Sequence, residues 1–207
     1  MAQIPRTFTT ETGAIASYDF NDFAAGTGIQ TFYGFSRSAN TNSFALSTAT
    51  PFSQRVITSG AISVSAPLIL DFDSEEFLLP RIVKGTATIN VPYRVTNSSG
   101  SNSNFVWVQL NKIAVDGTQY MIGQNSGAFS GSEAGGAKVE CIQIRDIDIN
   151  SGAIRTGEKI RLTIMVQAET AGNSPNAKIA HDPQNRTGDV TYETTKLVAW
   201  IPFLLDA

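Results

Sequence analysis

The sequence is poor in charged residues. Asp, Glu, Lys and Arg make up 16% of its 207 residues, against roughly 25% in an ordinary soluble domain. Ser, Thr, Asn and Gln take their place in stretches such as RSANTNSFALSTAT and VTNSSGSNSN. The net charge is −3 and there is no basic run, which argues against nucleic acid as a partner, because a phosphate backbone is bound by clustered Lys and Arg. Uncharged polar faces of this kind suit a protein that sits against neighbouring proteins.

Long apolar runs are missing as well. No stretch reaches the roughly 18–20 apolar residues needed to cross a bilayer, so we expect no membrane partner. The opening MAQIPRTFTTETGAIA has neither the basic region nor the apolar core of a secretory signal, which predicts synthesis in the cytoplasm. The length allows one large domain with a buried core.

Cysteine and histidine occur once each. Cys141, in KVECIQI, has no partner for an internal disulfide and is expected to be a small buried apolar residue. His181 stands beside Asp182 in IAHDPQNRTGD. A catalytic triad needs a nucleophile, a base and an acid that converge, no Gly-x-Ser-x-Gly elbow is present, and zinc needs several His or Cys ligands. We therefore expect no enzyme, no catalytic residue, no cofactor and no metal site.

Two groups of acids allow a calcium site or a glycosidase to be considered. Residues 71–76 read DFDSEE, and Asp146 and Asp148 share one strand face. Calcium needs six or more oxygens from a tight loop, and DFDSEE lacks the glycine spacing of such loops. Glycoside hydrolysis needs two carboxyls across a cleft. Solvated acids at strand ends are the simpler interpretation, and calcium stays a minor alternative.

The residues after His181 indicate a shaped loop. Asp182-Pro183 favours a turn, because the residue before proline is kept out of the helical region. Arg186 can bind Asp182 or loop carbonyls in a forked arrangement. We predict loop-shaping roles for Asp182, Pro183 and Arg186, and two long loops without strands at residues 123–137 and 172–193.

Alternation of apolar and polar residues is the dominant pattern. In GTATINVPYRVT it predicts one dry face and one wet face, the dry set being Ala87, Ile89, Val91, Tyr93 and Val95 and the wet set Thr86, Thr88, Asn90, Pro92 and Arg94. EKIRLTIMVQAE has the same pattern, and SNFVWVQLNKIAVDGTQYMIG predicts a hairpin that turns at Asp116-Gly117. AKVECIQIRDIDI predicts a strand with a bulge near Arg145-Asp146.

Shorter strands are expected at ASYDF, IQTFYGF, SFALSTA, SQRVITS and SAPLILDF, and one helical turn is expected at residues 74–77. Many strands with almost no helix predict an all-β fold, and clean dry and wet faces favour an antiparallel two-sheet jelly-roll sandwich.

The segment KLVAWIPFLL is apolar on both faces. A strand that is dry on both sides must be covered on both sides, and its proline argues for a place near a sheet edge. A second subunit would satisfy both conditions, at about 1.5–3 kcal/mol for each side chain buried. The predicted subunit interface consists of Leu197, Val198, Trp200, Pro202 and Leu204.

Three aromatic residues are candidates for a sugar-binding platform: Trp107, Tyr93 and Tyr120. Trp107 alternates with Phe105, Gln109 and Ile113, and burial in the core or an interface is the stronger expectation for it.

The segment SYDFNDFAAGTGIQTFYGF is followed, in order, by GTATINVPYRV, FVWVQLNKIAVDG, KIRLTIMVQA, HDPQNR and KLVAWIPFLL. This order of segments resembles jelly-roll auxiliary or decoration proteins of tailed-phage and related virus heads. Those proteins have a tumour-necrosis-factor-like trimeric fold. The resemblance covers residues 16–205 and transfers no catalytic residue. It implies a homotrimer on the virion head that contacts the major capsid protein and stabilises contacts between capsomers. Residues 1–15 would form an extended N-terminal arm, with contacts at Ile4, Pro5 and Phe8, and residues 16–207 the jelly-roll domain.

The alternative on the same fold is a carbohydrate- or receptor-binding module or spike on the virion surface, with a host-surface glycan as partner. Both functions place the protein on the virion after its synthesis in the host cytoplasm.

Overall fold

The computed structural model describes residues 27–39, 43–96, 104–125, 138–168, 175–186 and 194–204. They form strands and no helix, which confirms the all-β prediction. The strands are β1 (Thr27–Ser36), β2 (Phe44–Ser47), β3 (Ile57–Ala61), β4 (Leu68–Asp73), β5 (Arg81–Thr96), β6 (Asn104–Ile113), β7 (Gln119–Asn125), β8 (Lys138–Ile154), β9 (Lys159–Ala168), β10 (Asn176–Ala180) and β11 (Val198–Leu204). The arm contacts expected at Ile4, Pro5 and Phe8, the boundary at residue 15 and the ASYDF strand lie outside the described residues.

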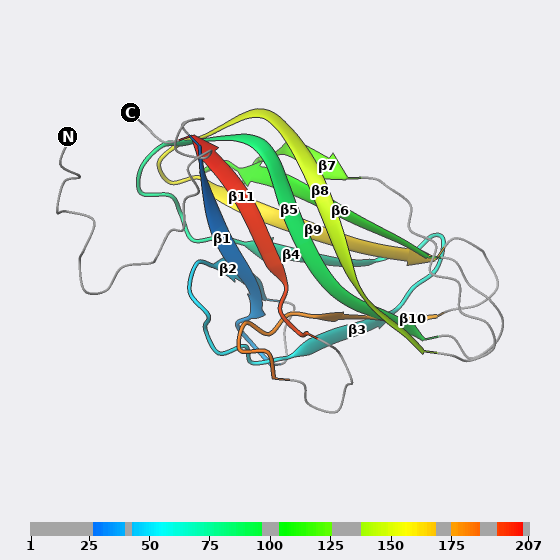
Figure 1. Cartoon of the computed structure of the whole chain (residues 1–207). Helices are drawn as coiled ribbons and strands as arrows, with labels where there is room; N and C mark the ends of the chain where they lie inside the picture. Colours follow the sequence, from blue (N-terminus) through cyan, green and yellow to red (C-terminus); the bar gives the residue numbers. More distant parts are fainter. Residues whose placement is uncertain are drawn as a thin grey trace, which may run out of the picture.

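The strands join into one mixed sheet, in the order β3-β10-β5-β11-β1-β2-β4-β9-β6-β7, with β8 also paired to β5. The antiparallel two-sheet jelly-roll sandwich is therefore not confirmed, because hydrogen bonds join all the described strands into one sheet. A short parallel pair, β2 with β4, makes it continuous, and Phe44 stands opposite Phe72 there. Figure 1 shows β1, β11, β5 and β8 side by side in front of β4, β9 and β6. None of the described residues belongs to a helix that could span a membrane.

The core lies between the inward faces of these strands. The predicted dry set of β5 is buried, and so is every second residue of β9 from Ile160 to Ala168. Aromatic rings pack in this core: the ring centroids of Phe44 and Phe72, on the paired strands β2 and β4, are 5.1 Å apart. A Cβ added to Gly123 of β7 would lie 2.5 Å from Ile147 Cγ2 of β8. The absence of a side chain at Gly123 therefore lets β7 pack against β8.

The wet face of β5 is not wet along its whole length. Pro92 and Arg94 are buried, contrary to the prediction. The alternation was misleading here because both faces of the C-terminal end of β5 are covered. Pro92 lies between the part of β5 that pairs with β11, which ends at Asn90, and the part that pairs with β10, which begins at Tyr93. At this position, a proline removes no hydrogen bond from either of these two ladders.

The last strand is central, not near an edge as its proline suggested, because β11 lies between β5 and β1. Its register with β5 breaks between Trp200 and Phe203. Pro202 falls in this break, where no N–H group is required by the ladder with β5. Opposite it, Gly85 has a φ of 117°, and an added Cβ there would lie 3.3 Å from Pro202 Cγ. Glycine at this position gives both the backbone conformation and the space that Pro202 needs.

The hairpin of β6 and β7 is confirmed, with Asp116 and Gly117 in its turn. Gly117 has a φ of 85°. The Asp116 carboxylate accepts a hydrogen bond of 2.9 Å from the Thr118 amide, and this bond lowers the pKa of Asp116. The residue types at Asp116 and Gly117 therefore favour this turn by themselves, without contacts from distant parts of the chain.

Three local predictions are wrong. The bulge of β8 lies at residues 150–151, because pairing with β5 is unbroken from Ile149 to Lys138. Residues 74–77 form no helical turn: the Ser74 amide and hydroxyl bind the Ile160 carbonyl and amide at 2.8 and 3.0 Å, and so continue the contact with β9. Strand β10 lies inside the loop expected at residues 172–193, between β3 and β5.

Candidate functional site

The His181 side chain is fully enclosed. It has no exposed surface, its ring centroid lies 5.2 Å from that of Phe44, and its Nε2 lies 2.8 Å from Thr58 Oγ1. Burial lowers the pKa of His181 to about 4, and the nearby positive charge of Arg55 acts in the same direction. The imidazole is therefore neutral near pH 7 and has no access to a ligand in solution.

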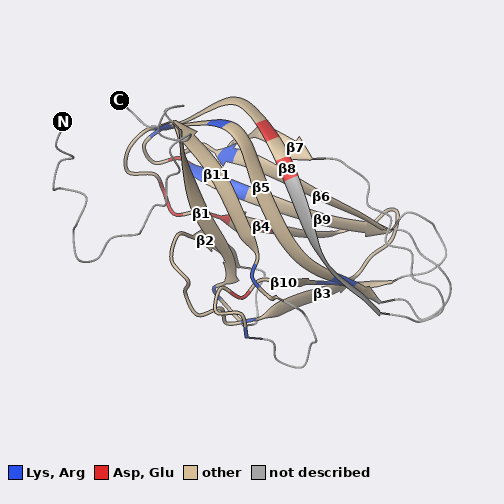
Figure 2. Cartoon of the chain, viewed as in Figure 1, with Lys and Arg blue, Asp and Glu red and all other residues tan. Residues whose placement is uncertain are grey.

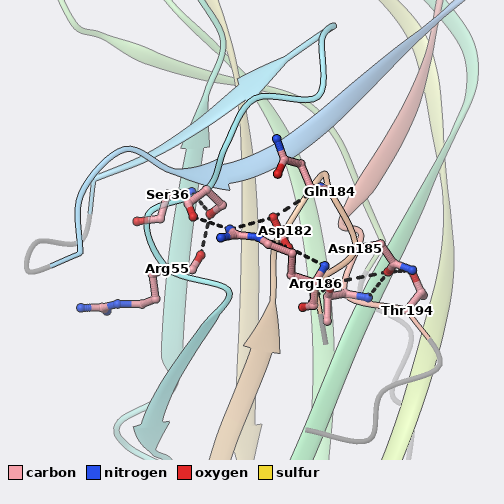
Figure 3. A network of polar contacts seen from close by, with 9 residues as sticks. Ser36, Arg55, Asp182, Gln184, Asn185, Arg186 and Thr194 are labelled. Atoms are coloured by element: carbon pink, nitrogen blue, oxygen red, sulfur yellow. Dashed lines mark hydrogen bonds and ion pairs between the residues drawn. The ribbon is translucent and has the colours of Figure 1, made fainter. Parts of the chain in front are cut away.

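The carboxylate of Asp182 is also without exposed surface, and Arg186 binds it (Figure 3). Arg186 Nε lies 2.9 Å from Oδ2, one terminal nitrogen lies 3.1 Å from Oδ1, and the Arg186 amide donates to Oδ2 at 2.6 Å. The same terminal nitrogen donates to the Ser53 carbonyl at 2.5 Å. Ser53 Oγ accepts from the Ser36 amide at the end of β1 at 2.9 Å. These bonds attach the loop after β10 to the end of β1, a strand that is not a neighbour of β10 in the sheet.

Asn185 is a loop residue that the sequence analysis missed. It has a φ of 57°, in the left-handed region, and its Oδ1 accepts from Thr194 Oγ1 at 2.9 Å and from the Thr195 amide at 2.8 Å. The type of residue was the available signal, since asparagine tolerates this conformation better than most residues. Pro183 is buried, and together these contacts fix the described part of this loop, residues 181–186 and 194–195.

The two aspartates of DFDSEE are bound by one arginine, whereas Glu75 pairs with Arg37 and Glu76 with Lys159. Arg161 Nε and a terminal nitrogen donate to Asp73 at 2.6 and 2.8 Å, and its other terminal nitrogen lies 3.4 Å from Asp71. Thr163 Oγ1 donates to Asp71 at 2.6 Å. The bond to Asp73 raises the pKa of Arg161 above its ordinary value. The part of the chain that the structure describes holds no group of three or more His, Cys, Asp or Glu side chains suited to a metal ion.

Asp146 and Asp148 are exposed and accept hydrogen bonds from Thr88 and Thr86, at 2.7 and 2.8 Å. Charged residues are sparse on the strands as a whole, as Figure 2 shows. Apart from such isolated charges, most side chains on the outer faces of the described strands are uncharged.

The five residues of the expected subunit interface differ in exposure. Leu197, Val198 and Pro202 are buried within the single chain. Trp200 and Leu204 keep part of their surface on the outward face of β11. Trp200 stands between Thr31 of β1 and Thr88 of β5. Contact with a second chain on this face would therefore fall on Trp200 and Leu204.

The three aromatic candidates for a sugar-binding platform also differ in their exposure to solvent. Tyr93 is buried and presents no surface for a ligand, whereas Tyr120 is half exposed, with the Lys112 ammonium 5.3 Å from its ring centroid. Trp107 is half-buried on the outward face of β6, because Val106 and Val108 occupy the inward positions. Trp107 was expected to be buried in the core or in an interface; it does not lie in the core, and burial in an interface stays a prediction.

Trp107 stands at a groove of about 270 Å³ on this outward face. The residues that line it are uncharged: Trp107, Val108, Gln109, Gln124, Asn125, Thr163 and Met165. They come from β6, β7 and β9, and the sequence analysis missed all but Trp107. The alternation of buried and exposed residues could place these side chains on an outward face. It could not predict which strands lie side by side.

No protein-family model matches the chain, and no curated protein matches it in sequence. Solved structures do match. An α-amino acid ester hydrolase has a TM-score of 0.57 at 12% identity over 84% of this chain, and an aminopeptidase from the marine sediment archaeon Thaumarchaeota archaeon has 0.58 at 10% identity over 86%. The VP2 subviral particle of infectious bursal disease virus matches with a TM-score of 0.33 at 12% identity over 87% of the chain and 38% of VP2, which is too weak to carry an argument.

The two hydrolases overturn the expectation that the chain is not an enzyme, since both solved structures above with TM-scores over 0.5 are enzymes by their names. At this identity the likeness shows a shared fold. The chain spans 36% and 37% of those two proteins, little more than a third of each.

Proposed function

We propose that the chain is a jelly-roll decoration protein of a virion, which forms homotrimers and seats on the major capsid protein at the capsid surface. The observation that carries this proposal is the outward face of β1 and β11. Ile29 is 41% exposed there and stands opposite Pro202, and Trp200 and Leu204 on the same face are only half-buried. An apolar strip on a sheet face favours contact with another protein.

A second apolar surface supports docking on another protein. Leu78 and Leu79, before β5, are 85% and 65% exposed, and Val115 in the β6–β7 turn is 78% exposed. Val115 and Phe77 both neighbour Gly157: an added Cβ on Gly157 would lie 3.1 Å from Val115 Cγ2, and the Gly157 amide donates to the Phe77 carbonyl at 2.8 Å. These side chains therefore belong to one end of the molecule, and we assign this end to the capsid shell.

The low charge of the sequence and its resemblance to decoration proteins of virus heads support the same role. Association through sheet faces with few charges carries little electrostatic repulsion between copies. The proposed extended arm of residues 1–15 would add contacts to the shell or to a neighbouring trimer.

The test compares two substitutions of exposed isoleucines. Ile29→Lys places a charge on the proposed trimer face, and Ile69→Lys is the matched control on β4, where Ile69 is 51% exposed. Light scattering of the wild type and of I69K is expected to give three times the chain mass of 22.2 kDa, and I29K is expected to run as a monomer. A wild-type monomer, or a trimer that persists in I29K, would contradict the proposal.

The fold likeness to two hydrolases favours a second candidate, a β-domain that works in a hydrolase. By their names those proteins act on α-amino acid esters and as an aminopeptidase. Turnover of an α-amino acid ester or an aminoacyl anilide by the purified chain would support this candidate, and the absence of turnover would reject it for the isolated chain. Any such activity would use residues other than His181, whose ring is enclosed, so kcat/KM would be unchanged in a folded His181 variant.

A further inference from the structure

The outward face of β9, β6 and β7 carries an aromatic pair beside the groove. The rings of Phe105 and Trp107, at alternate positions of β6, lie within 10° of parallel with centroids 6.3 Å apart. Trp107 stands opposite Met165 of β9, and the pairing of β6 with β7 ends where Val108 meets Asn125. The two rings therefore form an apolar surface along β6, beyond its paired segment with β7.

Polar side chains form the other part of the groove. Gln109 pairs with Thr163 on one side and with Gln124 on the other, so these three residues make a row next to Trp107. Gln109 Nε2 donates to Asn111 Oδ1 at 3.0 Å. This bond holds the Gln109 amide in place beside the groove.

Two further polar groups of the groove have no protein partner. Within the described parts of the chain, neither the indole N–H of Trp107 nor the side-chain amide of Gln124 bonds to another residue. Asn125 is already engaged, since its Nδ2 donates to the Asp146 carbonyl at 2.7 Å. The groove thus offers donors and acceptors beside an aromatic ring.

The chemistry of the lining selects a class of ligand. No charged side chain lines the groove, whereas phosphates and nucleic acids are bound by Lys and Arg. Amide groups both donate and accept hydrogen bonds, as sugar hydroxyls do, and an aromatic face provides an apolar surface for the C–H face of a pyranose ring. An apolar wall with a few placed polar groups is the usual design of a small-ligand site.

We propose that this groove binds a neutral oligosaccharide. One sugar ring stacks on Trp107 and a neighbouring sugar contacts Phe105, while hydroxyls bond to Gln109 and Gln124. The site uses the outward face of β6 and is separate from the proposed trimer face on β1 and β11, so either proposal can fail without the other.

Tryptophan fluorescence gives a direct readout. The chain has two tryptophans, and Trp200→Phe leaves Trp107 as the single reporter. W200F is titrated with cellohexaose, maltohexaose, mannohexaose and chitohexaose in turn. The proposal predicts a saturable change in Trp107 emission with at least one of these neutral hexasaccharides, and the absence of saturation with all four would overturn it.

Calorimetry on variants that keep Trp200 tests the residues. Trp107→Ala and Gln124→Ala are each expected to weaken binding at least about tenfold, and Trp107→Phe to retain part of it. Tyr120→Ala is the matched control, since Tyr120 is an exposed aromatic on β7 that does not line the groove, and its affinity is expected to equal that of the wild type. Circular dichroism checks each fold, and Q124A carries the test if W107A does not fold. Affinity unchanged in W107A and Q124A, or lost in Y120A, would overturn the proposal.

Discussion

Arg186 binds the buried carboxylate of Asp182, four residues earlier in the chain, through two side-chain hydrogen bonds of 2.9 and 3.1 Å. The pair is asymmetric: the Arg186 side chain is 35% exposed and the Asp182 side chain is fully buried. Removal of the arginine would therefore leave an unpaired charge in the interior, which costs more than the loss of a surface ion pair.

Arg186→Gln is expected to lower the free energy of unfolding by about 2 kcal/mol, because the Asp182 carboxylate loses its fork of donors. Arg37→Gln is the control, since Arg37 pairs with Glu75 at the surface, and it should change stability by less than about 0.5 kcal/mol. Urea unfolding measures both. Equal costs for the two variants would show that the Asp182–Arg186 pair has no special role in the loop.

His181 predicts an acid-sensitive contribution to stability. Its pKa is about 4 in the folded chain and about 6.5 when unfolded, so between these values only the unfolded chain takes up the proton. Stability therefore falls as the pH drops through this window, by about 3 kcal/mol in total, and this contribution levels off below pH 4. His181→Gln should remove the effect. Urea titrations at steps from pH 7 to pH 4 measure it, and parallel pH profiles of wild type and H181Q would contradict the account.

Gly123→Ala tests how β7 packs on β8. An added Cβ would lie 2.5 Å from Ile147 Cγ2 and 3.3 Å from the Asp148 carbonyl oxygen, and because Ile147 is buried and Asp148 contributes backbone, neither yields easily. The expected loss is about 1–3 kcal/mol. Gly60→Ala is the control, because the nearest atom there is a methyl group of the half-buried Leu68, at 3.1 Å. If thermal unfolding shows Gly123→Ala to cost no more than Gly60→Ala, β7 and β8 are not in close contact.

The strands with strict alternation could be predicted from sequence because burial of one face leaves a period of two in the residues. This is why β5, β6 and β9 were placed correctly, and the Asp116-Gly117 turn followed from its residue types. Strand β10 was missed because it has five residues, too few for alternation to stand out within a long polar segment. The break at β8 residues 150–151 depends on pairing with β5, which local sequence does not record.

The position of β11 shows a second limit. Pro202 indicated an edge, but a register break opposite Gly85 accommodates the proline in a central strand. The groove at Trp107 shows a third limit, since Gln124 and Thr163 meet there only because β7 and β9 flank β6. Strand order is a property of the whole fold, and it determines both the central position of β11 and the residues that meet in the groove at Trp107.

The proposal that copies meet at the face of β1 and β11 is tested most directly at Trp200. Trp107→Phe leaves Trp200 as the single tryptophan, and quenching of its fluorescence by iodide reports its access to solvent. Trimer formation predicts that quenching falls as the protein concentration rises from nanomolar to micromolar, because a second copy covers the half-buried indole. Quenching that is the same at every concentration, with the protein monomeric throughout, would contradict the account.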